Sequence, residues 1–290
     1  MKGILLAGGT GSRLHPTTRS INKHLLPIYD KPMIFYSLSV LMLAGIREIA
    51  LVTTSRDVPL FRNLLGEGED LGIKISYFTQ DDPKGIAEAF IITDTFISNE
   101  NCALVLGDNI FFGLQFSDIL KNSMNLKNGA NVFTTIVDDP RSFAVAELDT
   151  NNKIQSIIEK PKETKSKMAV TGLYFYDKNV CDIAKSLTPS ERGELEITDI
   201  NKYYLKLGSL SNTFLGRGFA WLDTGTNDSL LSASEFIRTI ETRQGLKIAC
   251  LEEIAFNNKW ITADHLERSY IRNKNSNYGA YIKKLMSGLN

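Results

Sequence analysis

The chain has 290 residues, which is long enough for one large α/β domain or two smaller ones. Its 33 Lys and Arg residues balance 33 Asp and Glu residues, so bulk charge favours no polyanion and nucleic acid is not expected as a partner. No apolar run reaches the length of a membrane-spanning helix, and residues 1–7 are too short for a signal peptide, so no membrane partner is expected.

The three cysteines, Cys102, Cys181 and Cys250, are far apart in the chain. They have no metal-ligand spacing and do not form an even-numbered disulfide framework. This pattern favours a reducing cytoplasm, with Cys102 and Cys250 as small core residues.

The first half of the chain alternates short apolar runs with longer helical patterns, which indicates a doubly wound, mostly parallel sheet. Pro32 suits a first helical position and Gly45 lies near the end of the same helix. The patterns predict strands at 2–7, 48–54, 73–78 and 102–108, and helices at 31–46, 58–66 and 85–96.

From about residue 130 the rhythm changes to strands with few helices between them, which predicts hairpins at a sheet edge. Residues 160–167 read as an exposed loop, and the last sixty or so residues look mainly helical. The patterns predict strands at 130–137, 143–148, 153–159 and 170–176, and helices at 196–208, 229–244 and 277–286. The expected fold is α/β: a Rossmann-like, mostly parallel central sheet flanked by helices, with an antiparallel edge insertion and a helical C-terminal part.

The stretch "ILLAGGTGSRLHPTT" (4–18) places a glycine turn after the first strand. A dinucleotide fingerprint needs G-x-G-x-x-G, but the pattern from Gly9 gives Gly11 and then Leu14, and the second strand ends without a ribose-binding carboxylate. A Walker A loop needs G-K-[ST], but Arg13 follows Ser12 here. The chain therefore has neither a dinucleotide fingerprint nor a Walker A loop. Without the dinucleotide fingerprint, a nicotinamide dehydrogenase is not expected.

What remains is a glycine turn with free backbone N–H groups at the mouth of a parallel sheet, followed by Arg13. Such turns collect anions, and the guanidinium fork suits phosphate oxygens. The alternative is a structural turn with a solvated arginine. Lys23, ten residues on, is a second candidate cation for the same polyphosphate, although a lone loop lysine is usually just solvated.

The pattern G-G-x-G-[ST]-R-L at 8–14, followed by K-x-L-L-P at 23–27, resembles the sugar nucleotidyltransferases. The rest of the chain is similar to the glucose-1-phosphate thymidylyltransferases in order and over nearly its whole length. The stretches that carry this resemblance are "YDKPMIFYSLSVLMLAGIREI", "LVLGDNIFFG", "VTGLYFYD", "RGELEITDIN", "LGRGFAWLDTGT" and "RQGLKIAC".

The resemblance implies a nucleotide-diphospho-sugar transferase fold and a Mg²⁺-dependent reaction of dTTP with glucose 1-phosphate. The products would be dTDP-glucose and pyrophosphate, the first step of dTDP-rhamnose and deoxysugar biosynthesis. It also implies a core over 1–226, with a nucleotide half at about 1–108 and a sugar-phosphate half at about 109–226. The helical segment 227–290 would serve oligomerisation or regulation.

The resemblance also implies roles for individual residues, since charge builds on the transferring and leaving groups. Arg13, Lys23 and Lys160 are the expected catalytic cations, and Asp108 and Asp223 the expected Mg²⁺ ligands, although a lone Asp before Asn is as often a turn former. The expected nucleotide-binding residues are Gly8, Gly9, Gly11, Ser12, Arg13, Lys23, His24, Gln80, Gly85 and Asp108. The expected sugar-phosphate-binding residues are Asn109, Ala144, Glu159, Lys160, Val170 and Tyr174, with Glu194 and Glu196 as either sugar-pocket or helix-capping residues.

The sequence departs from the family pattern at several positions in the presumed pockets. His24 stands where Gln is usual, and Glu88, also in place of Gln, lies near the expected pyrimidine. Phe143 replaces Tyr and Ala144 replaces a glycine, which costs stability if that position needs a positive φ. The remaining departures are Asp81, Asp82, Lys84 and Asn227.

Two alternatives stay open at this point. The same chemistry with UTP or another sugar 1-phosphate is one, and a non-catalytic nucleotide-sugar sensor is the other. The resemblance further implies a homotetramer inhibited by dTDP-rhamnose at a subunit interface formed by 236–250 and 42–49. An amphipathic helix packed on its own core would explain those stretches equally well.

Overall fold

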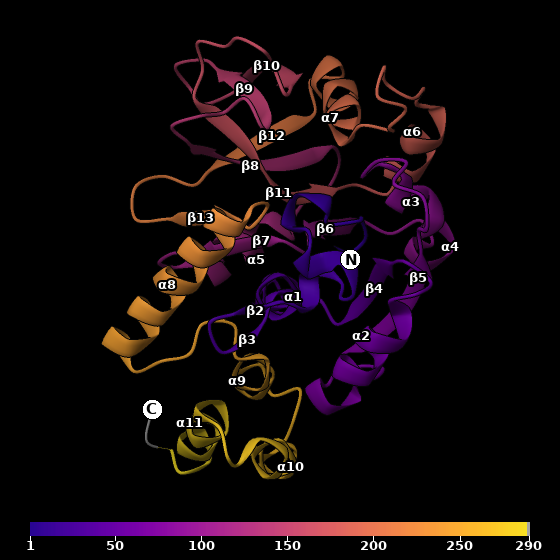
Figure 1. Ribbon diagram of the computed structural model, residues 1–290. Helices are drawn as coiled ribbons and strands as arrows, with labels where there is room; N and C mark the ends of the chain where they lie inside the picture. Colours follow the sequence, from indigo (N-terminus) through magenta and orange to yellow (C-terminus); the bar gives the residue numbers. More distant parts are fainter. Residues whose placement is uncertain (289–290) are drawn as a thin grey trace.

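The computed structural model describes residues 1–288 and is built around a nine-stranded sheet. Along the main path of the sheet the strand order is β10-β9-β11-β6-β1-β4-β5, while β8 pairs with β11 and with β12. Figure 1 shows the antiparallel strands at one end of the molecule and the C-terminal helices at the other.

The parallel part of the sheet consists of four strands: the three inner ones are buried over most of their length, and the edge strand is mostly half-buried. Alternate residues face opposite sides of the sheet, so Leu5 and Val105 join one hydrophobic cluster while Ile4 and Leu104 join the other. A strand that is covered on both faces reads as a continuous apolar run, which is why these strands were predictable. They are β1 (Lys2–Leu6), β4 (Glu48–Thr53), β5 (Lys74–Thr79) and β6 (Cys102–Leu106).

The antiparallel part is organised by β11 (Met168–Tyr176), which lies inside the sheet. One of its sides pairs with β8 (Ala130–Ile136), and the other pairs first with β9 and then with β6. The hairpin of β9 (Ala144–Leu148) and β10 (Ile154–Glu159) forms the expected edge insertion. The prediction of hairpins at an edge therefore holds for β9 and β10, whereas β11 joins the two parts of the sheet.

Five strands were missed by the sequence patterns, because each is only two to five residues long and carries no clear period. β12 (Leu210–Phe214) runs parallel to β8. β7 (Asn109–Phe112) and β13 (Ala220–Asp223) form a separate antiparallel ribbon in which Asp223 is paired with Asn109. The small hairpin of β2 (Pro27–Ile28) and β3 (Lys31–Pro32) precedes the first helix.

Helices cover both faces of the sheet. One cluster holds side chains of α1 (Met33–Leu43), α2 (Val58–Leu65) and α5 (Phe116–Ser123). The other holds side chains of α3 (Glu88–Ile92), α4 (Asp94–Ile97), α6 (Val180–Ser186) and α7 (Ile197–Lys206). The single helix predicted at 85–96 is thus two short helices that break at Thr93, whose hydroxyl donates to the carbonyl of Ala89.

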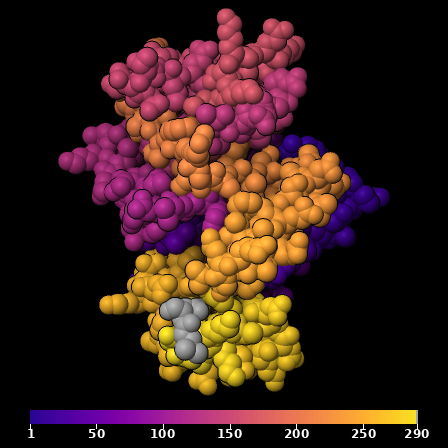
Figure 2. Space-filling model, turned by 90° about the vertical axis from the view of Figure 1, so that its left-hand side faces the viewer, coloured from indigo at the N-terminus to yellow at the C-terminus, as the bar shows by residue number. Residues whose placement is uncertain are grey.

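The C-terminal segment begins with α8 (Asn227–Gln244), which a capping box of Thr226 and Ser229 starts and Gly245 ends. It continues with α9 (Leu251–Asn257), α10 (Ala263–Asn273) and α11 (Asn277–Met286). These last helices form a knob at the far end from the antiparallel strands (Figure 2). The proposed division at residue 226 stays a prediction, and residues 289 and 290 of this segment lie outside the described residues.

Buried ion pairs tie the C-terminal segment to the small β2–β3 hairpin. Lys31 Nζ lies 2.6 Å from Asp30 Oδ1 and 2.8 Å from Glu241 Oε1. Lys247 Nζ closes the network on Asp30 and lies 2.7 Å from Glu241 Oε2. Each charge has partners of opposite sign, which satisfies groups that are costly to bury alone.

Cys102 and Cys250 are 0% and 1% exposed, as expected of core residues, and Cys181 is also buried. Across residues 1–288, no helix is long and apolar enough to cross a membrane.

Candidate active site

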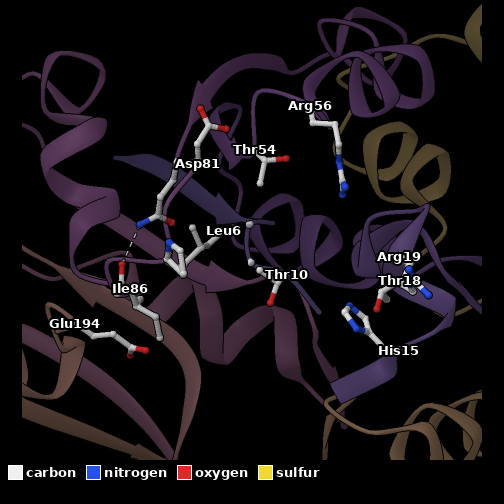
Figure 3. A pocket seen from close by; sticks show the side chains of 15 residues that line it. Leu6, Thr10, His15, Thr18, Arg19, Thr54, Arg56, Asp81, Ile86 and Glu194 are labelled. Carbon is white, nitrogen blue, oxygen red and sulfur yellow. Dashed lines mark hydrogen bonds between the residues drawn. The ribbon is translucent and has the colours of Figure 1, made fainter. Parts of the chain in front are cut away.

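Two adjoining cavities open at the carboxyl ends of the central strands. The first, here called the glycine cavity, has a volume of about 620 Å³ and is drawn in Figure 3. It is lined by Leu6, Gly8, Gly9, Thr10, His15, Thr18, Arg19, Thr54, Arg56, Gln80, Asp81, Pro83, Gly85, Ile86 and Glu194. Ligands of open α/β sheets bind at this end of the strands.

The second, here called the carboxylate cavity, has a volume of about 390 Å³. It shares Ile86 and Glu194 with the glycine cavity. It is lined by Arg13, Ile86, Leu106, Asp108, Asn109, Ser142, Phe143, Ala144, Glu159, Lys160, Val170, Gly172, Tyr174, Glu194, Glu196, Ile197, Trp221 and Asp223. All six residues that the sequence predicts for sugar-phosphate binding are in this group.

The glycine loop leaves β1 and passes along the glycine cavity. Gly9 has φ +95° and nothing near its missing side chain, so its backbone is open to the cavity. Gly11 has φ +58°, and its carbonyl accepts a 2.7 Å hydrogen bond from the Thr18 hydroxyl. Ser12, which follows, is exposed and starts a short 3₁₀ helix. The loop therefore presents backbone N–H groups, as an anion site requires.

Lys23 and Asp108 form an ion pair at the end of β6, with Nζ 2.6 Å from Oδ2. Lys23 lies on a 3₁₀ turn (Lys23–Leu25) that the Asn22 side chain caps. Asn22 also donates to the carbonyl of Ala7 and to Asp57, so the turn is fixed against β1. Burial alone would raise the pKa of Asp108, but Lys23, His24 and Asn109 together offset it and lower that pKa to about 2.

Asp223 ends β13 and faces the same cavity as Asp108. Burial and the charge of Asp108 raise the pKa of Asp223 to about 6, against the opposing charges of Lys23, Arg13 and Lys160. The Arg13 guanidinium lies against Gly225, where a β-carbon would come within 3.0 Å of Nη2. Two carboxylates and three cations from five separate segments thus meet at one place.

The donor set of this place fits a hard divalent cation. A raised pKa means that the charge of Asp223 is incompletely compensated by the protein, and carboxylate oxygens are the ligands that Mg²⁺ prefers. In the part of the chain described, no group of three or more His, Cys, Asp or Glu side chains is arranged to hold a metal. A site with Asp108 and Asp223 would therefore depend on phosphate oxygens and water for its remaining ligands, which is usual for Mg²⁺.

A second group of charges lies across the carboxylate cavity, around Glu159 at the end of β10. Thr198 donates a hydrogen bond to Glu159 Oε2, and Lys160 Nζ lies 3.6 Å from Oε1. Lys160 has φ +38°, a strained backbone for a residue with a side chain, and its N–H donates to the carbonyl of Phe143. The strain and the bond to the start of β9 direct Lys160 at the cavity rather than along the loop 160–167.

Sequence reasoning missed Arg192, which joins the acidic residues of this group. Its Nη2 lies 2.8 Å from Glu196 Oε1, 3.5 Å from Glu194 and 3.6 Å from Glu159. Glu196 is also bound by the Ser190 hydroxyl, so the loop before α7 is ordered by its own carboxylates. The available signal was the "RGELE" stretch itself, in which Arg192 is the one cation.

Asn109 has its side-chain groups engaged by the protein. Its amide donates 2.9 Å to Asp108 Oδ1, and its oxygen accepts from the Gly172 N–H and from Trp221 Nε1. Phe143 packs edge-on against Trp221 with ring centroids 4.9 Å apart. Ala144 starts β9 without a positive φ, so the backbone strain considered for the glycine-to-alanine change does not arise.

Segment 80–88, which lines the glycine cavity, is tied to the segment that precedes α7. Leu195 N–H donates 2.8 Å to the carbonyl of Lys84, and Ala87 N–H donates 3.1 Å to the carbonyl of Leu195. Gly85, with φ +104°, passes so close that a β-carbon would lie 2.3 Å from the Leu195 carbonyl oxygen. Ile86 and Glu194, which line both cavities, flank this contact, so it supports the wall that the two cavities share.

His24 is buried beside the site rather than on a cavity wall. Its Nδ1 lies 2.9 Å from Asn22 Oδ1, and its ring packs on Gly107. Burial lowers the pKa of His24 to about 4, so the imidazole is neutral at neutral pH.

Comparison with known proteins identifies the family of this chain. The nucleotidyl transferase family model matches residues 2–240. A glucose-1-phosphate thymidylyltransferase from Neisseria meningitidis is 54% identical over 286 residues, which cover 99% of each chain. The chain belongs to the glucose-1-phosphate thymidylyltransferase family.

Further members and structures agree with this assignment. The glucose-1-phosphate thymidylyltransferase of Mycolicibacterium smegmatis is 50% identical over 99% of each chain. The crystal structure of a Bacillus anthracis protein assigned to the same enzyme class, in complex with a sucrose, has a TM-score of 0.77 and 44% identity, and covers 82% of this chain and 95% of that one. A UDP-glucose pyrophosphorylase complexed with UDP-glucose, at 23% identity and a TM-score of 0.71, covers 82% of this chain and 98% of that one and shares the fold.

Proposed function

We propose that the protein transfers the thymidylyl group of dTTP to glucose 1-phosphate, with Mg²⁺, and releases pyrophosphate. The family membership supports the reaction. The observation that carries the proposal is the meeting of Asp108, Asp223, Arg13 and Lys160 in one cavity, beside a second cavity edged by a glycine loop.

In this proposal the two cavities hold the two substrates. The base lies against Gln80 and Gly85, and the triphosphate follows the glycine loop toward Arg13 and Lys23. The glucose lies against Val170 and Tyr174, where the Glu159 carboxylate accepts hydrogen bonds from its hydroxyls. Lys160 holds the phosphate of the sugar phosphate at the border of the two cavities.

The reaction then needs no enzyme nucleophile. An oxygen of the sugar phosphate attacks the α-phosphorus of dTTP in line, the new P–O bond forms, and the bond to the β-phosphate oxygen breaks. Arg13, Lys23 and Lys160 offset the charge that builds on the transferring and leaving groups. Asp108 and Asp223 would hold Mg²⁺, which would further neutralise the charge of the phosphate oxygens.

A pyrophosphate-release screen tests this function. Purified protein with Mg²⁺ is given dTTP or UTP together with glucose 1-phosphate or another sugar 1-phosphate. We expect the highest kcat/KM for dTTP with glucose 1-phosphate. A higher value for UTP or another sugar identifies the alternative substrate, and binding of dTDP-glucose without pyrophosphate release from any pair supports the non-catalytic sensor.

We also propose a cytoplasmic homotetramer inhibited by dTDP-rhamnose. The buried cysteines favour the cytoplasm, and Leu231 and Leu246, 61% and 47% exposed at α8 and just after it, support self-association. Light scattering gives the oligomeric state. A rate that stays flat as dTDP-rhamnose is added would refute the inhibition.

A further inference from the structure

Gln80, which lines the glycine cavity, has both hydrogens of its side-chain amide engaged by the protein. Its Nε2 donates 3.1 Å to the Gly85 carbonyl and 2.7 Å to Glu88 Oε2. A carbonyl and a carboxylate only accept hydrogen bonds, so the end of the amide that faces them is the NH₂ group. The orientation of Gln80 is therefore fixed by its neighbours.

The oxygen of the same amide points the other way. Gln80 Oε1 lies 3.6 Å from the position a β-carbon would take on Gly8, another lining residue of the glycine cavity. The side chain thus offers the cavity an acceptor and no donor.

Glu88 is held in place by the fold. It is the first residue of α3, whose next residues, Ala89 and Phe90, are fully buried in the core. The backbone just before it is pinned by the bond from Ala87 N–H to the Leu195 carbonyl. Glu88 cannot leave Gln80 by a backbone shift without disturbing this packing.

We propose that Glu88 is a positioning residue that sets base choice by locking the Gln80 oxygen toward the base. The proposal rests on the proposed function, because it assumes that a nucleotide base lies in the glycine cavity. A thymine or uracil presents its N3–H to the oxygen and is accepted. Cytosine presents an unprotonated N3, which places two acceptors face to face, and is rejected. The 4-oxo group of thymine receives no hydrogen bond from Gln80.

Comparison of dTTP, dCTP and 4-thio-dTTP with the wild-type protein tests whether the Gln80 oxygen selects the base through N3–H. We measure kcat and KM with glucose 1-phosphate, and nucleotide affinity by calorimetry without the sugar phosphate. A lost or mismatched polar contact costs on the order of tenfold or more, so dCTP should fall by at least about that factor in affinity and in kcat/KM. 4-Thio-dTTP, which keeps N3–H but has a weak acceptor at position 4, should stay within about twofold of dTTP. A loss for 4-thio-dTTP as large as that for dCTP overturns the proposal.

The variant Glu88→Gln tests the locking itself. A glutamine at this position can accept from or donate to Gln80, so the Gln80 amide is free to turn over. We expect the preference for dTTP over dCTP to fall at least about tenfold, through KM and affinity, with kcat at saturating dTTP unchanged. The control Asp94→Asn, which removes a carboxylate paired with Lys185 on the neighbouring helix, should keep the wild-type preference.

An unchanged preference in Glu88→Gln overturns the proposal. If the wild-type protein binds nucleotides with the expected order but releases no pyrophosphate, the proposed function fails while the role of Glu88 stands. If it turns over dTTP and dCTP equally, the role of Glu88 fails while nucleotidyl transfer stands.

Discussion

The glycine cavity and the carboxylate cavity adjoin each other but are made in different ways. The first is shaped largely by loops from the N-terminal half, and its inner wall includes three glycines, Gly8, Gly9 and Gly85. The second is shaped mainly by strand ends, and titratable side chains from β10, β13 and the turn after β6 line it. In the proposed function, the first holds the triphosphate largely with backbone groups, and the second holds the sugar phosphate with charged side chains.

This difference determines what substitutions do in each cavity. Removing a charge from the carboxylate cavity leaves the backbone intact and removes a single interaction. Adding a side chain to the glycine cavity moves backbone and so disturbs several interactions at once. The predictions below use this contrast.

The largest effect is expected for Asp108→Asn. The substitution removes the ion pair with Lys23 and one of the two carboxylates that fit Mg²⁺. We expect kcat to fall on the order of a thousandfold, with a modest loss of nucleotide affinity. Pyrophosphate release and calorimetry measure the two quantities. The control Asp139→Asn, at an exposed carboxylate paired with Arg141, should behave as wild type, and a kcat within tenfold of wild type for Asp108→Asn would contradict the assignment.

A smaller effect is expected for Lys160→Met, which keeps most of the length of the unbranched side chain and removes its charge. The kcat/KM for glucose 1-phosphate should fall about a hundredfold, while affinity for dTTP stays close to wild type. Lys162→Met, two residues on in the exposed loop, is the control. An equal loss of dTTP affinity would show that Lys160 serves the glycine cavity as well and would remove the contrast between the two.

Gly85→Ala should affect both cavities. A β-carbon at this position would lie 2.3 Å from the Leu195 carbonyl oxygen, so the shared wall has to move. We expect about 2 kcal/mol lower unfolding free energy in urea, and higher KM values for both substrates. Gly208→Ala has a similar positive φ but open space around it, and should cost about 1 kcal/mol with both KM values unchanged. A change in one KM alone would show that the wall is not shared.

The smallest effect is expected for substitution of His24, which is buried beside the site and packs on Gly107. Since the folded pKa of about 4 is below the usual 6.5, the unfolded chain binds the proton more tightly. This contribution to stability is present above pH 6.5 and is lost as the pH falls toward 4. Between pH 7 and 5 the loss is about 1 to 2 kcal/mol, and His24→Gln should flatten that part of the urea-unfolding profile. An unchanged pH profile would contradict the buried, neutral assignment.

The sequence predicted the parallel half of the fold well, because strands such as β1 and β6 are covered on both faces and read as apolar runs. It missed the β7–β13 ribbon, whose four-residue strands carry no clear period. That ribbon is the element that pairs Asp223 with Asn109 and so brings the two carboxylates together. The sequence motifs therefore identified the residues of the site. The way these residues come together could not be predicted, because it depends on the β7–β13 ribbon, whose strands are too short to recognise.

Some side chains of the site lie where the sequence predicts, and others do not. Lys160 and Asp108 line the carboxylate cavity, which opens at the strand ends where ligands of such sheets bind. His24 and Asn109 are directed inward, and their neighbours in space, Gly107 and Trp221, come from other segments. Arg192 was missed because a cation beside three glutamates reads as a solvated charge run until the chain folds.

The hydrogen bonds between Lys84, Leu195 and Ala87 have a consequence for changing the substrates of this protein. They join a segment beside the base to a segment beside the sugar through two backbone contacts. Substitutions chosen separately for a new base and for a new sugar would therefore act on one mechanical unit, and their effects on kcat/KM would not multiply. Evolution of this chain toward a different nucleotide sugar would have to change the base and sugar specificities together, or first weaken the backbone hydrogen bonds that couple the two segments.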